Sequence, residues 1–379
     1  MGFNDDRAHD ALNGETSRAV TLNKADCSGI MVFAEFNDGR FEPVTYELIG
    51  KARELAGKTG QEVLCVAIGC GLGAAAQDLL RYPVDRVLVY DAPEFVHFVA
   101  GTYAAAMEDA IVAERPSVVL IGATPVGRSL APRVAVRFRT GLTADCTVLD
   151  IRPNGELVQT RPASGGNIMA TIVTRNARPQ MATVRPKVMP KAEVDEAQVG
   201  EDAERRRGKK DRLQMRSITS DHALAELARH LSRVRVTGEK PLPKAESISD
   251  ARVIVAVGRG VRSKADLAMF EDLATRLGGV LGGSRPLVEQ GFIPSDRQVG
   301  QSGRTVRPDL YIACGISGAI QHVAGMSGSG TIIAINKDKD APIFETANYG
   351  LVGDMYEIVP TLLRLLEPQD SQASAERGV

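Results

Sequence analysis

The side chains best suited to chemistry lie in short polar segments of the last third of the chain. These segments read VGRG (257–260), GGSR (282–285), QVGQS (298–302), GISGAIQH (315–322) and NK (336–337). They supply glycine backbone, hydroxyl, amide, imidazole and guanidinium groups, and they contain no acidic or cysteine cluster suited to a metal. Helix N-termini and free N–H groups at the carboxyl edge of an α/β sheet bind phosphate. The segments therefore predict a site for a phosphate-bearing cofactor and no metal site.

Single residues within these segments are candidates for particular contacts. Arg259 follows a predicted strand, where its side chain can reach a pyrophosphate. The segment 298–302 supplies backbone N–H groups, an amide and the hydroxyl of Ser302. Ser317 is expected at a helix start, about one turn before His322. A histidine in an apolar helix more often packs than reacts, and no cysteine or carboxylate pair near it predicts a metal ligand.

Another glycine-rich turn, Gly69–Ala74, fits the dinucleotide-binding pattern G-x-G-x-x-A and follows an apolar strand candidate. Asp91 ends the next predicted strand, near the place of a ribose-binding acid. The pattern is short, and a turn that only packs a helix against its strand also satisfies it. An NAD-dependent dehydrogenase that uses this turn is therefore one alternative function. A non-redox nucleotide-binding module is another.

Alternating strand and helix patterns must position these segments. Between residues 29 and 150, and again from residue 252, short apolar runs alternate with helical periodicity. Such β-α-β order predicts parallel strands joined by helical crossovers. The fold class is therefore α/β, with two domains that are each a mostly parallel, doubly wound sheet. The first half is expected to contain strands at 30–36, 62–68, 86–90 and 117–121, and the second half at 252–257, 309–313 and 331–335.

The region from Thr147 to Val184 follows another pattern. Three β-prone runs, 157–160, 168–174 and 181–184, are joined by turn-rich sequence, so we expect added antiparallel strands in the first domain. The predicted organisation is an N-terminal extension (1–26), an N-terminal α/β domain (27–200), a charged linker (201–250) and a cofactor-binding domain (251–379). The basic run 205–212 follows acidic residues, so a solvated linker is favoured over a nucleic-acid patch.

Composition limits the class of protein further. A chain of 379 residues with 44% hydrophobic and 25% charged residues is long enough for two globular domains. The formal net charge of −1 argues against dominant contacts with nucleic acid or anionic membranes. The polar first residues lack the apolar core of a signal peptide, and no long apolar run predicts membrane insertion. We therefore expect a cytoplasmic protein.

Over residues 258–366 the chain closely resembles the alpha subunit of electron-transfer flavoproteins. The resemblance rests on VGRG, GGSR, VGQS, GISGAIQHVAGM, AINKD, APIF and YGLVGDM, which occur in this order. Residues 29–190 also look like the first domain of that family, including GLTADC (141–146) and RPQMATVRPKVM (178–189). The resemblance implies one FAD bound in the C-terminal domain. It also implies a heterodimer with a beta subunit, which pairs with the first domain and holds a second FAD or an AMP.

The resemblance also implies which residues bind the cofactor. Arg285 would lie against the isoalloxazine, and Arg285, Ser302 and His322 would tune the redox potential by favouring an anionic, singly reduced flavin. No separate catalytic residue is expected. The implied cofactor-binding residues are Arg259, Ser284, Arg285, Val299, Gly300, Gln301, Ser302, Ser317, Gly318, Ala319, Ile320, Gln321, His322, Asn336, Asp354 and Met355.

Part of the sequence is similar to the bifurcating branch of the family, which includes relatives linked to nitrogen fixation and acyl-CoA reduction. Members of that branch take electrons from NADH and divide them between a high- and a low-potential acceptor. The implied partners are an acyl-CoA dehydrogenase or a quinone oxidoreductase, and ferredoxin or flavodoxin. The chain departs from the family pattern at Ser164, often aromatic in that branch, at Ser302, often Thr, and at Asn348, often Asp.

Overall fold

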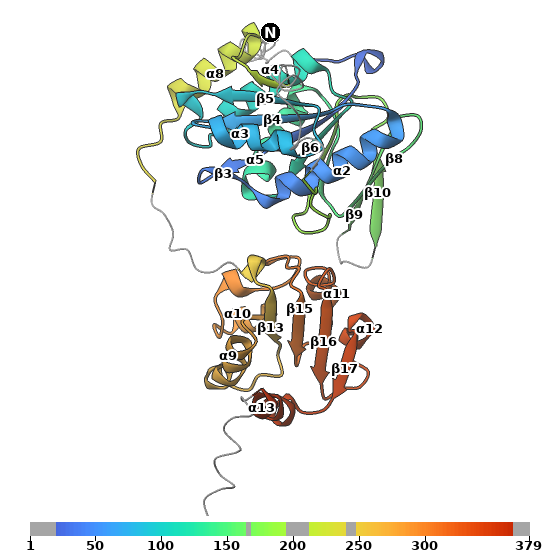
Figure 1. Cartoon of the computed structure of the whole chain (residues 1–379), viewed down its shortest axis with the longest axis vertical. Helices are drawn as coiled ribbons and strands as arrows, with labels where there is room; N and C mark the ends of the chain where they lie inside the picture. Colours follow the sequence, from blue (N-terminus) through green and yellow to red (C-terminus); the bar gives the residue numbers. More distant parts are fainter. Residues whose placement is uncertain (1–19, 164–167, 195–211, 240–247, 367–379) are drawn as a thin grey trace, which may run out of the picture. The chain divides into compact units, whose positions relative to one another are not determined.

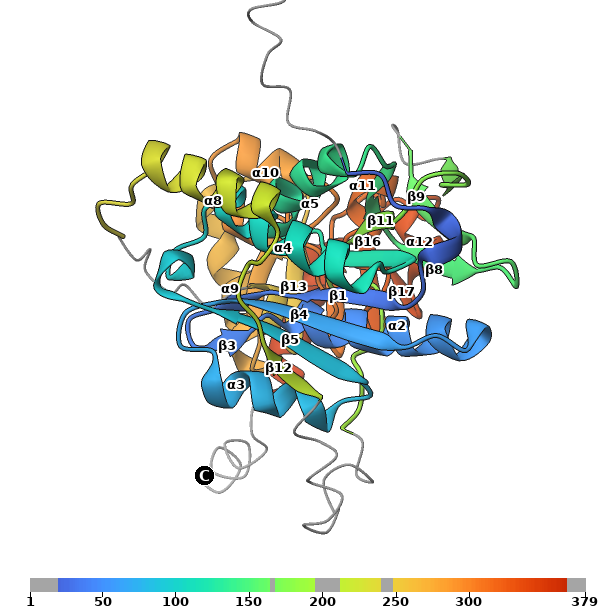
Figure 2. The ribbon, with the colours of Figure 1, turned by 90° about the horizontal axis from the view of Figure 1, so that it is seen from above.

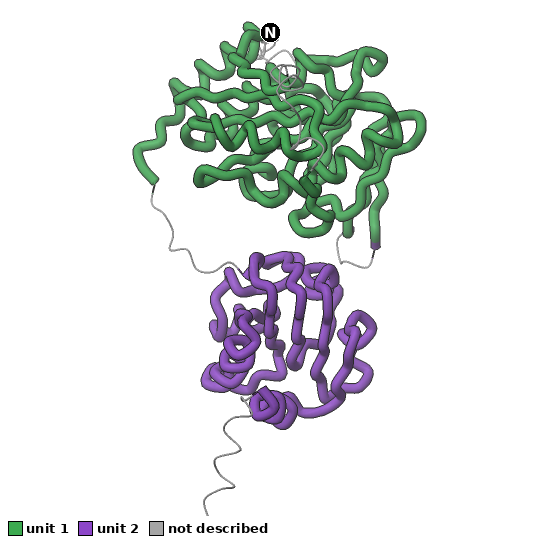
Figure 3. The backbone as a smooth tube through the Cα atoms, viewed as in Figure 1, with its two compact units in different colours: residues 1–162, 169–239 green, residues 163–168, 240–379 purple. Residues whose placement is uncertain are grey.

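The computed structural model of the chain describes residues 20–163, 168–194, 212–239 and 248–366. The chain divides into two compact units, residues 1–162 with 169–239, and residues 163–168 with 240–379 (Figure 3). Each unit is built on a parallel sheet whose two faces are covered by separate hydrophobic clusters. The predicted α/β class, with two doubly wound sheets, is confirmed.

The first unit contains a seven-stranded sheet of order β12-β5-β4-β1-β6-β11-β7, in which every neighbouring pair is parallel. All residues of the central strand β1 are at most 1% exposed, as expected for a parallel strand covered on both faces. The strands are β1 (Ile30–Ala34), β4 (Val63–Gly69), β5 (Arg86–Asp91), β6 (Val118–Gly122), β7 (Leu142–Cys146), β11 (Gln180–Val184) and β12 (Leu213–Met215). A small hairpin, β2 (Phe36–Asn37) with β3 (Arg40–Phe41), follows β1.

Helices cover both faces of this sheet (Figure 2). One face packs against α2 (Pro43–Thr59) and α3 (Gly73–Asp78). The other packs against α4 (Ala100–Glu114), α5 (Pro125–Arg137) and α8 (Asp221–Arg233). Alternate residues of β1 supply the two clusters, because successive side chains of a strand point to opposite faces.

The expected antiparallel strands are present in part. β8 (Val148–Ile151), β9 (Leu157–Pro162) and β10 (Met169–Val173) form a separate antiparallel sheet of order β10-β9-β8. The run 181–184 does not join it; as β11 it lies parallel between β6 and β7 in the main sheet. Every residue of β11 is buried, so its strand propensity reflects burial on both faces and not a hairpin.

The linker predicted over 201–250 is too long. Residues 213–215 form the edge strand β12, paired with β5, and α8 packs its buried Ala223 and Leu227 into the first unit's core. An ion-pair network fixes α8 to α4 and α5: buried Glu108 contacts Arg137 and His222. The predictions for residues 1–19, 195–211 and 240–247 lie outside the described residues.

The second unit contains a five-stranded parallel sheet of order β14-β13-β15-β16-β17 (Figure 1). Two of its strands, β14 and β17, were not predicted from the sequence. The strands are β13 (Val253–Val257), β14 (Val280–Gly283), β15 (Leu310–Cys314), β16 (Thr331–Asn336) and β17 (Tyr349–Val352). The helices are α9 (Leu267–Arg276), α10 (Arg285–Glu289), α11 (Ile320–Val323), α12 (Ile343–Thr346) and α13 (Met355–Leu365).

Candidate functional site

The order of strands in the second unit reverses between β13 and β15, because the chain passes from β13 to β14 on one side and returns to β15 on the other. The crevice at such a reversal is where ligands bind in open α/β sheets. The segments that follow β13 and β15 lie next to each other at this crevice, where the Gly258 N–H donates to the Cys314 carbonyl at 2.9 Å. A Cβ at Gly258 would lie 2.2 Å from the Gly315 carbonyl oxygen, so only glycine fits.

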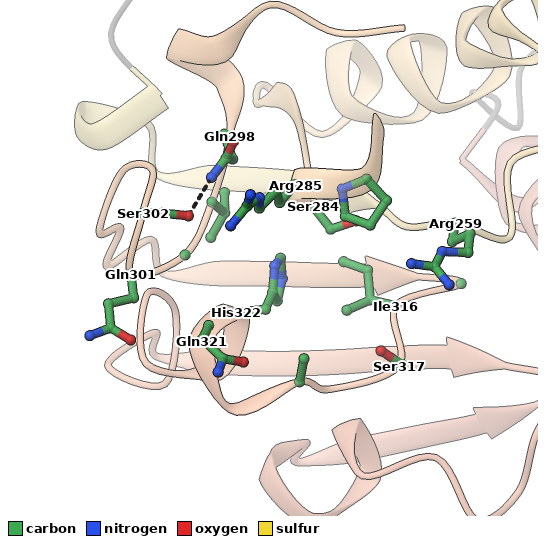
Figure 4. A pocket seen from close by; sticks show the side chains of 15 residues that line it. Arg259, Ser284, Arg285, Gln298, Gln301, Ser302, Ile316, Ser317, Gln321 and His322 are labelled. Atoms are coloured by element: carbon green, nitrogen blue, oxygen red, sulfur yellow. Dashed lines mark hydrogen bonds between the residues drawn. The ribbon is translucent and has the colours of Figure 1, made fainter. Parts of the chain in front are cut away.

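A cavity of about 680 Å³ opens from this crevice (Figure 4). Its size is in the range of cofactor pockets. A second cavity of about 360 Å³ shares Arg259, Gly315 and Ser317 with the first, so the two adjoin at the reversal point. The first is lined by Arg259, Ser284, Arg285, Pro286, Gln298, Val299, Gly300, Gln301, Ser302, Gly315, Ile316, Ser317, Ala319, Gln321 and His322.

Most of the predicted binding residues therefore come together. Asn336, Asp354 and Met355 line the second cavity, and the other candidates except Gly318 and Ile320 line the first. Ser317 is not at a helix start, contrary to expectation, because α11 begins only at Ile320. Gly318, with φ +90°, turns the chain between the two and contributes backbone geometry.

The loop after α10 forms one wall of the larger cavity. It is tied to the sheet where the Val299 N–H donates to the Gly283 carbonyl at 2.9 Å. It is tied to α11 where the Gln301 N–H donates to the Gln321 carbonyl at 2.7 Å. These two main-chain hydrogen bonds, one on each side of Gly300, hold the glycine-rich turn in place against the sheet and α11.

His322 lies in the middle of the cavity in Figure 4 and is only 6% exposed. Its Nε2 is 2.9 Å from the hydroxyl of buried Tyr311, whereas its Nδ1 has no partner among the described residues. Burial lowers the pKa of His322 to about 4, and the main chain of Val299 offsets this only in part. The imidazole is therefore neutral at physiological pH and supplies hydrogen-bonding groups but no charge.

Positive charge comes instead from arginines. Arg259, at the junction of the cavities, makes no ion pair within the described ranges. Arg285 is 68% exposed and pairs with Glu289 one turn later on α10, at 2.8 Å. An unpaired guanidinium at the centre of an elongated site suits a pyrophosphate, because it can donate two parallel hydrogen bonds.

The wall of the smaller cavity includes two residues that no sequence motif predicted, Arg262 and Tyr356. The Arg262 guanidinium lies 4.3 Å from the Tyr356 ring centre and 3.1 Å from an Asp354 carboxylate oxygen. Asp354 also caps α13 by accepting from the Tyr356 N–H at 2.9 Å. No local pattern links Arg262 to Tyr356, because about a quarter of the chain separates them.

These features fit FAD, the cofactor implied by the sequence. FAD is elongated, with a flavin and an adenosine joined through a pyrophosphate, and two adjoining cavities that meet at Arg259 match that division. A buried ring nitrogen without a partner is costly unless a ligand or water supplies one. The unpaired Nδ1 of His322 therefore also fits a site that is completed by a cofactor.

The glycine turn of the first unit is built differently. The main-chain N–H groups of Gly71 and Leu72 donate to the two carboxylate oxygens of Asp91, at 2.7 and 3.0 Å. These are the donors that a dinucleotide pyrophosphate would need. The Asp91 carboxylate therefore occupies the main-chain donors of the turn and is not free for the ribose contact expected of it. This arrangement disfavours the dehydrogenase alternative.

The reversal point of the first sheet is also closed. It lies between β1 and β6, and there the Thr124 hydroxyl donates to the Glu35 carboxyl group at 2.5 Å. Burial raises the pKa of Glu35 to about 7, against the lowering effect of the Thr124 hydrogen bond. The hydrogen-bonded Thr124 and Glu35 side chains fill this reversal point from within, whereas the reversal point of the second unit opens into a cavity.

Comparisons with known proteins agree with this assignment. Residues 30–205 match the electron transfer flavoprotein domain, and residues 247–327 match the electron transfer flavoprotein FAD-binding domain. The electron transfer flavoprotein subunit alpha of Clostridium acetobutylicum is 45% identical over 90% of this chain and 98% of its own length. The chain belongs to the electron transfer flavoprotein alpha-subunit family. The resemblance seen in the sequence is thus confirmed, and the C-terminal unit is an FAD-binding domain.

Other relatives in the family have more specific names. The lactate dehydrogenase (NAD(+),ferredoxin) subunit LctC of Acetobacterium woodii is 46% identical, over 96% of this chain and 82% of that protein. Protein FixB of Rhizobium meliloti is 39% identical, over 91% of this chain and 96% of that protein. Membership of the family implies a beta subunit as partner. In the part of the chain that the structure describes, no helix is both long and apolar enough to cross a bilayer.

Proposed function

We propose that this chain holds FAD across the two adjoining cavities and passes electrons, with its beta subunit, from NADH to a pair of acceptors by flavin-based bifurcation. The observation that carries the binding site is the meeting of both cavities at Arg259, which has no ion-pair partner among the described residues. The relative named lactate dehydrogenase (NAD(+),ferredoxin) subunit LctC supports the bifurcating branch, because its name couples a nicotinamide to ferredoxin. The cytoplasmic location expected from the sequence stays a prediction.

The cavity residues then have distinct roles. Arg259 would bind the pyrophosphate, and the wall around Arg262, Asn336 and Asp354 would hold the adenosine end. The larger cavity would hold the flavin, which supplies the one- and two-electron chemistry when bound. Around it, Arg285 adds positive charge and Ser302 a hydroxyl, and both favour a flavin that gains negative charge on reduction.

The downstream acceptors are proposals of the same kind. An acyl-CoA dehydrogenase or a quinone oxidoreductase would take electrons at high potential, and ferredoxin or flavodoxin at low potential. The beta subunit would hold a second FAD, because bifurcation needs a separate flavin that receives two electrons; AMP in that place would indicate simple electron transfer. Ser164, one of the departures from the bifurcating pattern, lies outside the described residues, whereas Asn348 accepts a structural hydrogen bond from the Ile332 N–H at 2.7 Å.

The decisive experiment is coexpression with the beta subunit of the heterodimer. We expect a yellow heterodimer with two FAD per pair, in which NADH reduces ferredoxin only while a high-potential acceptor is present. If the heterodimer contains one flavin and does not reduce ferredoxin under any condition, bifurcation is excluded and the protein is a simple electron carrier. A colourless heterodimer would contradict the proposed site itself.

The first variant concerns Arg285. Arg285→Ala is expected to lower the flavin reduction potential by about 10–40 mV, the equivalent of about 0.2–1 kcal/mol, because an exposed positive charge is removed. Glu289→Gln is the matched control of opposite sign, since it frees Arg285 from its ion pair and should raise the potential. Both shifts should shrink at high salt. Spectroelectrochemical titration measures them, and unchanged curves for both variants would remove the electrostatic role of Arg285.

A further inference from the structure

Gln298 and Ser302, the two ends of the segment 298–302, make a contact with each other that the sequence did not predict. The side-chain Nε2 of Gln298 donates to the Oγ of Ser302 at 2.9 Å, as the dashed line in Figure 4 shows. Gln298 is 9% exposed and lines the same cavity as Ser302. No described residue accepts a hydrogen bond from the Ser302 hydroxyl.

The main chain of Gln298 is fixed from several directions. Its carbonyl accepts from the Arg304 N–H at 2.7 Å, its N–H donates to the Ser295 carbonyl at 3.2 Å, and it forms a β-bridge with Gly283 at the end of β14. Ser302, by contrast, is exposed and lies in a tight turn, closed by a hydrogen bond from the Gly303 N–H to the Gly300 carbonyl. Because Gln298 is nearly buried on a fixed main chain while Ser302 is exposed, the amide is the more restrained of the two side-chain groups.

The chemistry of a hydroxyl makes this restraint directional. A serine oxygen has two acceptor lone pairs and a single hydrogen. When an amide N–H occupies one lone pair, the hydrogen stays available for an acceptor elsewhere, and the space that Ser302 lines includes the cavity. A donor oriented before the ligand arrives stabilises developing negative charge without the cost of reorientation.

We infer that Gln298 is a positioning residue for the flavin: its amide directs the Ser302 hydroxyl hydrogen into the cavity and thereby raises the flavin's reduction potential. The inference rests on the proposed function, in which Ser302 donates to the bound flavin. Gln298 acts through Ser302, and it is needed because the turn that carries Ser302 does not orient the hydroxyl by itself.

A double-variant cycle on the FAD-loaded heterodimer tests this. Ser302→Ala is expected to lower the potential of this subunit's flavin, and Gln298→Met to lower it by a smaller amount, because the hydroxyl then rotates freely. In the Ser302→Ala background, Gln298→Met should add no further shift. Gln290→Met, an exposed glutamine of the same unit that lines neither cavity, is the matched control and should leave the potential unchanged.

Three outcomes would overturn the inference in different ways. Equal shifts from Gln298→Met with and without the Ser302 hydroxyl would show that Gln298 acts on the flavin independently. A rise in potential would show that Ser302 donates to the Gln298 amide oxygen instead. If Ser302→Ala itself has no effect while FAD stays bound, the proposed contact of Ser302 fails, and the role of Gln298 fails with it.

Gln298→Glu covers the case in which the methionine variant loses its flavin. A carboxylate only accepts hydrogen bonds, so it would draw the Ser302 hydrogen away from the cavity. We expect a potential at least as low as that of Ser302→Ala. A potential equal to that of the unmodified protein would overturn the inference.

Discussion

Gly318→Ala should abolish tight FAD binding while the first unit stays folded. Gly318 has φ +90°, and a Cβ there would lie 2.1 Å from the backbone nitrogen of Ile343. That nitrogen donates to the Ser317 carbonyl at 3.1 Å and fixes the start of α12 against the site. The backbone strain alone costs about 1–2 kcal/mol, and displacement of α12 adds to it, so FAD affinity should fall by more than about tenfold.

Gly328→Ala is the matched control for this variant. Gly328 is an exposed glycine of the same unit, its φ is not positive, and the nearest atoms to an added Cβ belong to the flexible Arg307 side chain at 3.6 Å. Flavin content after purification and fluorescence titration with FAD measure both variants. Wild-type affinity in Gly318→Ala would show that the turn at Gly318 tolerates a side chain and does not shape the site.

Glu108→Ala is expected to have the largest effect on the stability of the first unit. Glu108 is fully buried in α4 and pairs with Arg137 of α5 and His222 of α8. The Arg137 side chain is only 10% exposed, so removal of Glu108 leaves a nearly buried charge with Glu226, at 3.1 Å, as its remaining carboxylate partner. Removal of one member of a buried ion pair costs about 3–5 kcal/mol of unfolding free energy.

Glu54→Ala provides the comparison. Glu54 lies on α2, 48% exposed, and pairs with Lys51 and Lys58 one turn away in each direction. Surface pairs of this kind contribute at most about 1 kcal/mol. Denaturant unfolding of the full-length chain, followed by circular dichroism, measures both, with flavin content as a separate readout of the second unit. Similar losses for the two variants would contradict the assignment of α8 to the first unit's core.

The alternation of strands and helices could be predicted from the sequence because each parallel strand is a short apolar run between helical periods. The run that became β11 was misassigned, since a short β-prone segment looks the same in a hairpin and in a buried parallel strand. β14 was missed because it ends in two glycines, which are rare in strands. β12 was missed because its three residues lie in charged sequence and give no periodicity.

The candidate site was predictable where one motif supplies several contacts, as with residues 298–302. It was not predictable where distant residues meet. The stacking of Arg262 on Tyr356 and the saturation of the first glycine turn by Asp91 both depend on strands that only the folded sheet brings together. A sequence motif shows which chemical groups are present. Whether those groups are free to bind a ligand depends on the hydrogen bonds that they make in the folded protein.

The carboxylate that fills the turn at Gly71 and Leu72 also limits where a nicotinamide can bind on this chain. A reduced nicotinamide has no anchoring point at that turn while Asp91 stays in place. Under the proposed function, NADH would therefore have to bind elsewhere in the heterodimer than at this turn. A single carboxylate thus occupies the main-chain donors that the glycine pattern would otherwise offer to a ligand.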